Sequence, residues 1–249
     1  MSPFDLELGE SGNAFAIHAM HFKLGLYEHQ SAAAIQSVID IIQKNPSLAE
    51  NIKDIQTINV AIYEPAFSII ADPAKRTPRT RQSADHSLPF ILATVLQKAA
   101  RMGALDRKNF GWSQGMLLPE DYSEAALADV GVHAIMQKIN IVHGGLEYDR
   151  LYPEGLPTCV SITHSRLGEL DSDRILFPLG HAHSDLEKTR TFVDEKFRRL
   201  VAGAVESPQF IQRHLCLTNA PPDHVANLYS FRFVFVFNYT GIIVIYTVS

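Results

Sequence analysis

Segments with helical and strand-like spacing of hydrophobic residues alternate along most of this chain. Residues 31–44 place apolar side chains three and four positions apart behind Ser31, which can cap a helix. Residues 58–62 instead alternate apolar with polar or small side chains, as a half-buried strand does. Further helices are expected over 85–102, 123–139 and 185–205, and further strands over 139–142, 157–163 and 174–177. This alternation predicts an α/β fold of packed helix and sheet layers.

Composition narrows the class of protein. The chain has 249 residues, of which 46% are hydrophobic, enough for a buried core. A net charge of -5 disfavours nucleic acid as a partner. Its two cysteines, Cys159 and Cys216, are too few for a disulfide framework or an iron-sulfur cluster. No secretory signal or Arg-rich transit peptide is visible at the start, so a reducing compartment such as the cytoplasm is the default expectation.

A basic stretch precedes an Asp-His pair in the middle of the chain. Lys75, Arg76, Arg79 and Arg81 come shortly before residues 85–86, which open an apolar run. Arginine presents a planar fork of donors that matches carboxylate or phosphate, and the first N–H groups of the helix expected here also attract anions. The alternative interpretation is a solvated basic loop followed by an ordinary helix cap, Asp85 or Ser87.

Several motifs carry a family resemblance. The two longest are HFKLGLYEHQSAAAI at residues 21–35 and TRQSADHSLPF at residues 80–90. Five shorter ones are IYEPA (62–66), LLPEDY (117–122), VHGGLEYD (142–149), YPEGLP (152–157) and FPLGHA (177–182). With these motifs the chain resembles the MmgE/PrpD family, specifically its fungal 2-methylcitrate dehydratase branch, from about residue 14 to about residue 200.

The resemblance implies a domain organisation. Residues 14–180 would form the family's C-terminal α/β domain, and residues 181–228 a helical segment that in the family returns to an N-terminal helical domain. That N-terminal domain is expected to be absent from this chain, which would then be a truncated form. Residues 229–249 form an apolar tail unlike the family. Its run from 231 to 248 could be a hairpin turning near 238–241, and it is too short and polar for stable membrane insertion to be expected.

The resemblance also implies an activity. Members of this branch are metal-independent hydro-lyases that convert 2-methylcitrate to 2-methyl-cis-aconitate in the methylcitrate cycle of propionate catabolism. The resemblance further implies a mitochondrial location, a homodimer in the intact enzyme, a small tricarboxylate substrate and no cofactor. A non-catalytic fragment or paralogue that acts as a binding module is the alternative.

Candidate site residues follow from the same motifs. The resemblance implies that Lys23 and His29 lie at the active-site cleft, and that His86 faces or braces the substrate region. The arginines of the basic stretch, Arg76, Arg79 and Arg81, would hold substrate carboxylates together with Lys23. Without the resemblance, Lys23 reads as a solvated cation and each histidine as a residue packed locally at a helix start.

Two other chemistries were weighed and disfavoured. GWSQG at residues 111–115 matches the GxSxG nucleophile elbow of acyl hydrolases, but polar residues stand where an apolar strand is needed. The pairs His18 with His21 and His181 with His183 could contribute metal ligands, yet neither has a carboxylate partner at motif spacing. The sequence therefore favours dehydration by side chains alone.

We expect chelation to leave any dehydratase activity unchanged, because the sequence shows no set of ligands at metal-binding spacing. The measurement is turnover of 2-methylcitrate before and after EDTA treatment. Loss of turnover that iron or zinc restores would contradict this expectation.

Overall fold

The computed structural model describes residues 20–202, 221–223, 233–239 and 242–248. The chain divides into two compact units, Met1–Thr189 and Arg190–Ser249. The domain limits predicted at residues 180 and 228 stay predictions.

The first unit contains a mixed four-stranded sheet in the order β2-β1-β3-β4. Its strands are β1 (Ile55–Ile62), β2 (Ile139–His143), β3 (Thr158–His164) and β4 (Gly168–Asp171). β1 pairs parallel with β2 and antiparallel with β3, and β3 pairs antiparallel with β4. The strands expected over 58–62, 139–142 and 157–163 are confirmed, and so is the α/β fold class.

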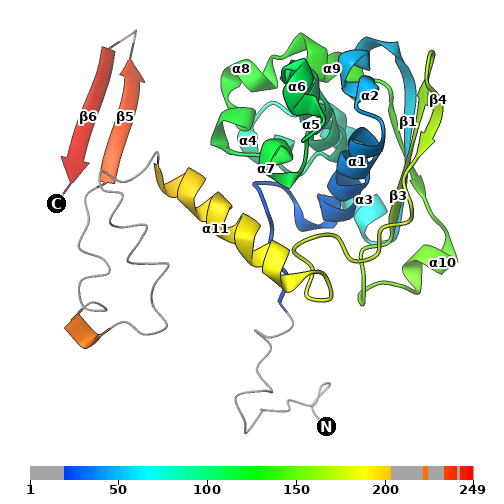
Figure 1. The fold of residues 1–249 in the computed structure, drawn as a ribbon. Coiled ribbons are helices and arrows are strands. Elements are labelled where there is room, and N and C mark those ends of the chain that lie inside the picture. Colours follow the sequence, from blue (N-terminus) through cyan, green and yellow to red (C-terminus); the bar gives the residue numbers. More distant parts are fainter. Residues whose placement is uncertain (1–19, 203–220, 224–232, 240–241, 249) are drawn as a thin grey trace, which may run out of the picture. The chain divides into compact units, whose positions relative to one another are not determined.

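Two long helices, α1 (Ala32–Lys44) and α5 (Leu88–Arg101), lie on one side of this sheet (Figure 1). The shorter α-helices are α2 (Ser47–Glu50), α3 (Ala66–Ile70), α4 (Arg81–Ala84), α6 (Ala104–Arg107), α7 (Trp112–Gly115), α8 (Glu124–Leu127), α9 (Val130–Met136) and α10 (Leu146–Asp149). Turns of 3-10 helix are η2 (His29–Ser31), η3 (Ile52–Asp54), η4 (Pro73–Arg76) and η5 (Pro119–Tyr122). The expected charged helix is α11 (Leu186–Ala202).

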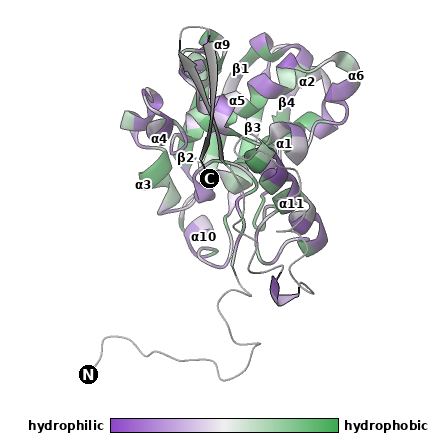
Figure 2. Ribbon diagram, turned by 90° about the vertical axis from the view of Figure 1, so that its left-hand side faces the viewer, coloured by the Kyte–Doolittle hydropathy of each residue, from purple (hydrophilic) through white to green (hydrophobic). Residues whose placement is uncertain are grey.

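The core lies between the sheet and the two long helices. Ile58, Val60 and Ile62 of β1 are fully buried, while Asn59 between them is exposed. Every residue of α5 from Leu88 to Leu96 is buried, as expected for a helix surrounded by other elements. Figure 2 shows hydrophobic residues concentrated around α5 and the central strands. This packing holds the start of α5, where a site residue was predicted.

The helix expected over 85–102 begins later than predicted. Its first residue is Leu88, because the Ser87 hydroxyl accepts the Phe90 N–H and caps the helix. Residues before it form the separate helix α4, so Ser87 rather than Asp85 is the cap.

The helix expected over 123–139 is divided in two. Ser123 accepts the N–H of Ala126 at the start of α8, and Asp129 accepts the N–H of Val132 at the start of α9. Two capping side chains within seven residues start two short helices where the apolar spacing alone predicted one.

The edge strand predicted over 174–177 is wrong. That segment makes only an isolated bridge between Thr158 and Ile175, and β4 is the edge strand next to β3. β4 is short and largely exposed, so it lacks the apolar alternation that reveals a strand. Between the segments expected to be helical over 85–102 and 123–139, the chain forms the short helices α6, α7 and η5.

In the second unit, β5 (Phe233–Tyr239) pairs antiparallel with β6 (Ile242–Val248). The predicted hairpin is therefore confirmed in its two strands, while residues 240–241 lie outside the described residues. Within the described part of the chain, no helix combines the length and apolar character needed to cross a membrane.

Gly180 fixes the end of the FPLGHA motif against the start of the described chain. Its backbone has φ +96°, and its carbonyl accepts the Phe22 N–H at 2.7 Å. The Thr189 hydroxyl accepts the Gly180 N–H at 3.1 Å. A Cβ atom at Gly180 would lie 2.2 Å from the Phe22 carbonyl oxygen, so only glycine fits here.

We expect Gly180→Ala to lower the free energy of unfolding by about 2 kcal/mol or more, because it adds a backbone clash to an unfavourable φ. Gly168→Ala is the matched control. Its φ is +78° but nothing lies within 4 Å of the added Cβ, so it should cost only about 1 kcal/mol. Urea unfolding measures both, and equal losses would contradict the proposed clash.

Candidate active site

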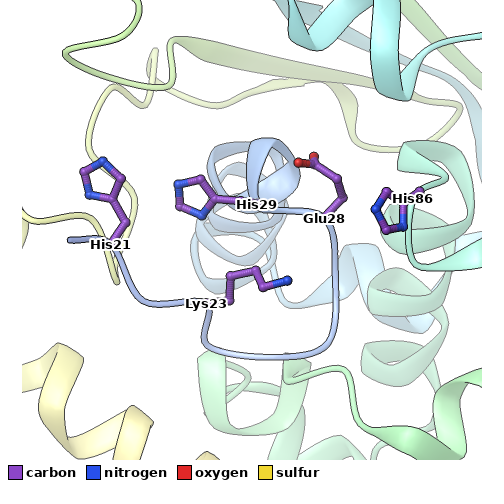
Figure 3. Close-up of a pocket in the computed structure, with 5 residues that line it drawn as sticks. All are labelled: His21, Lys23, Glu28, His29 and His86. Carbon is purple, nitrogen blue, oxygen red and sulfur yellow. The ribbon is translucent and has the colours of Figure 1, made fainter. Parts of the chain in front are cut away.

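One pocket brings together all three residues predicted to be catalytic. It has a volume of about 390 Å³ and is lined by His21, Lys23, Glu28, His29 and His86. Figure 3 shows that four of these side chains come from the loop leading into α1, and that His86 comes from the segment between α4 and α5. Glu28 was not among the predicted site residues, and His21 was considered only as a metal ligand.

The LLPEDY motif (117–122) holds the loop that carries four of the lining residues. The Leu26 N–H donates to the Leu117 carbonyl at 2.9 Å, and the Tyr122 hydroxyl donates to the Leu26 carbonyl. A Cβ at Gly25 would lie 3.1 Å from the backbone of Leu117, so the two segments approach closely. These contacts fix the position of the loop relative to the helices.

A single backbone bond joins the two longest motifs. The Glu28 N–H donates to the Asp85 carbonyl at 2.7 Å. Asp85 also holds the neighbouring ring, because its carboxylate is hydrogen-bonded to Nδ1 of His86. The Ser87 hydroxyl, which caps α5, donates to the Lys75 carbonyl at 2.6 Å. His86 thus enters the pocket from a segment anchored at both sides.

Burial shifts the pKa values of two adjacent residues, Glu28 and His29, in opposite directions. Burial, together with smaller effects of the nearby His21 and Lys23, lowers the pKa of His29 to about 4. Burial also raises the pKa of Glu28, against the opposing effects of the Gln30 N–H, His86 and Lys23. His29 is therefore a neutral imidazole at pH 7, beside the ammonium group of Lys23.

Further histidine rings stack beside the pocket. The ring of His21 stacks on His29 with centroids 5.4 Å apart and planes 7° apart. On its other side His21 stacks on His181 at 4.0 Å and 23°. His181 is buried, whereas His183 is exposed and pairs with Glu154 at 3.2 Å.

The predicted substrate-binding arginines do not line this pocket. Arg76 turns toward the sheet and donates from Nη1 to the Ile139 carbonyl at 3.0 Å. Arg79 lines a separate depression with Glu124 and His133. Arg81 lies exposed on α4. Their role in binding a substrate stays a prediction, and the pocket itself supplies Lys23 as its cation.

The alternative chemistries gain no support from the geometry. GWSQG forms the short helix α7, and the helix α6 rather than a strand precedes it, so Ser113 does not sit on a nucleophile elbow. Among the described residues, no three His, Cys, Asp or Glu side chains are grouped to hold a metal ion. His18 lies outside the described residues.

We expect acid to destabilise the fold through His29. The unfolded histidine has a pKa of 6.5 and the folded one about 4, so only the unfolded chain gains a proton as pH falls through this window. The contribution of His29 to stability is fully present above pH 6.5 and is lost as the pH falls toward 4. His29→Gln should reduce the loss between pH 7 and pH 5 in urea unfolding, whereas the exposed Lys44→Met should not. An unchanged loss in His29→Gln would contradict the burial of His29.

One known protein family matches most of this chain. The family model for the MmgE/PrpD C-terminal domain matches residues 27–104 and 111–218, which include Glu28, His29 and His86. No curated protein matches the chain at a significant level. Because the family match extends over more than half of its residues, the chain belongs to the MmgE/PrpD family and contains that family's C-terminal domain.

Proposed function

We propose that this chain carries one wall of the active site of a hydro-lyase that dehydrates 2-methylcitrate to 2-methyl-cis-aconitate. The observation that carries the proposal is the meeting of a neutral His29, the cationic Lys23 and the carboxylate-held His86 in one pocket. A neutral imidazole can accept a proton, and an adjacent ammonium group attracts the carboxylates of a tricarboxylate.

Dehydration needs two proton transfers. A base removes the proton from the carbon next to a carboxylate, the electron pair forms the C=C bond, and the hydroxyl leaves as water after taking a proton from an acid. We assign the base to His29. Its Nε2 is buried and has no hydrogen-bond partner in the described part of the chain, which leaves Nδ1 to meet the substrate.

His86 suits the role of the acid. Asp85 binds its Nδ1, which orients the ring and leaves Nε2 to face the departing hydroxyl. Lys23 holds a substrate carboxylate and stabilises the negative charge that develops when the proton is removed. Glu28 lies between these groups and offsets part of their positive charge.

In this proposal a helical domain of the family enzyme supplies the opposite wall of the cleft. The enzyme then acts in the methylcitrate cycle, in mitochondria and as a homodimer. These three features rest on the resemblance alone. General acid-base catalysis requires groups within hydrogen-bond reach of the substrate, so one wall without the other is expected to be a poor catalyst.

The test compares the purified chain with a fusion to a helical N-terminal domain from another family member, both assayed on 2-methylcitrate. We expect the fusion to be active, and His29→Gln to lower its kcat by about 10²–10⁴-fold. Lys23→Met should mainly raise KM. Lys44→Met, which removes an exposed cation paired with Asp173, is the matched control and should change neither.

Tricarboxylate binding is tested separately by thermal unfolding of the chain alone. A ligand at a hundredfold excess over its dissociation constant adds about 2.7 kcal/mol of stability. We expect 2-methylcitrate to raise the Tm of the wild-type chain and Lys23→Met to reduce that rise. An inactive fusion, together with no shift in the Tm of the chain alone, would exclude the dehydratase and leave a non-catalytic module.

A further inference from the structure

We propose that His21 binds the substrate as a neutral hydrogen-bond donor, with its ring proton held on Nε2 by the backbone of the turn at residues 180–184. The group it would bind is a carboxylate or hydroxyl oxygen of the tricarboxylate. The identity of that oxygen rests on the proposed function, whereas the position of the ring proton does not.

The contact that fixes the proton is a backbone hydrogen bond. The Ala182 N–H donates to Nδ1 of His21 at 3.0 Å. A backbone N–H can only donate, so Nδ1 must present its lone pair, and the neutral ring must carry its proton on Nε2. Nε2 is the other ring nitrogen, separated from Nδ1 by one carbon atom, and the ring itself lines the pocket.

The next ring is fixed in the same way. The His183 N–H donates to Nδ1 of His181 at 3.1 Å, so His181 also carries its proton on Nε2. The turn that supplies both N–H groups is closed by bonds from His181 N–H to the Pro178 carbonyl and from Ser184 N–H to the His181 carbonyl, each 2.9 Å. Two successive amides of one turn therefore set the tautomers of two stacked histidines.

Burial and the neighbouring His183 oppose a positive charge on His21. From its own loop it faces Lys23, Glu28 and His29, and from the turn it faces His181 and His183. Protonation at Nδ1 would also break the bond from Ala182. Burial lowers the pKa of His21, and the charge of His183 lowers it further.

Two adjacent imidazoles thereby receive different roles. His29 has no such backbone donor among the described residues and is available to accept a proton, whereas His21 has its accepting nitrogen already occupied. A neutral imidazole that donates from a fixed nitrogen can stabilise negative charge on a substrate oxygen without giving up its proton. His21 is therefore a substrate-binding residue rather than the base.

Two amide substitutions separate the donor from the structural contact. In His21→Asn the side-chain oxygen can accept the Ala182 N–H, but no donor reaches the position of Nε2. In His21→Gln the longer side chain places an amide N–H near that position. We expect citrate and 2-methylcitrate to bind His21→Asn about tenfold or more weakly, and His21→Gln within about threefold of the wild type, by titration calorimetry.

The second measurement reads the tautomer without any ligand. In ¹⁵N spectra of the histidine-labelled chain at pH 8, we expect His21 to show a protonated Nε2 and an unprotonated Nδ1. A protonated Nδ1 would overturn the proposal whatever the enzyme does. Equal weakening in the Asn and Gln variants would overturn the donor role while leaving the dehydratase in place. Failure of the wild-type chain to bind either tricarboxylate would overturn the proposed function and, with it, the substrate-binding role.

Discussion

The hydrogen bond from the Glu28 N–H to the Asp85 carbonyl is the contact on which the pocket depends. It joins a loop that precedes α1 to the segment that precedes α5, and it positions Glu28 and His29 opposite His86. Neither segment is a regular element, so burial of their neighbours rather than secondary structure holds them. The buried helix α5, with Ser87 as its cap, gives one side of the bond a fixed origin.

Low solvent exposure then shifts the pKa values of the side chains in this pocket. Histidine in water titrates near neutral pH, but partial burial keeps His29 neutral well below it. The same burial favours the uncharged form of Glu28, although Lys23 and His86 counteract it. Unequal surroundings of this kind let ordinary side chains act as bases and acids.

Much of the fold could be predicted from sequence, because long periodic segments report burial directly. The alternation over 58–62 and the apolar run within α5 identified the central strand and the central helix. β4 escaped prediction because its residues are mostly exposed, and the split between α8 and α9 depends on two capping bonds that periodicity does not register. Lys23, His29 and His86 were named from family motifs, and the structure brings them together.

The remaining site residues could be recognised only from the structure. Glu28 stands next to His29 in sequence, but a carboxylate before a helix ordinarily reads as a cap, which it also is. His21 gains its meaning from Ala182, a residue that shares no local pattern with it. The arginines of the basic stretch are the opposite case, because the sequence indicated a role that the structure does not show. Their density suggested an anion site, yet Arg76 donates a hydrogen bond to the carbonyl of Ile139 in β2.

The contact between Phe22 and Gly180 has a consequence for the order in which the protein assembles. β1 and β3 can pair once the chain has been synthesised to His164, since their registers involve nothing later. The loop that follows can meet Leu117 and Asp85 earlier, but its first residues, His21 and Phe22, gain their backbone partners only when Gly180 and the turn after it have emerged. Contacts between distant segments form late because their loop must first close. A nascent chain would therefore form its sheet and core before its pocket is complete. The ability to bind a substrate would then be the last property that the first unit acquires.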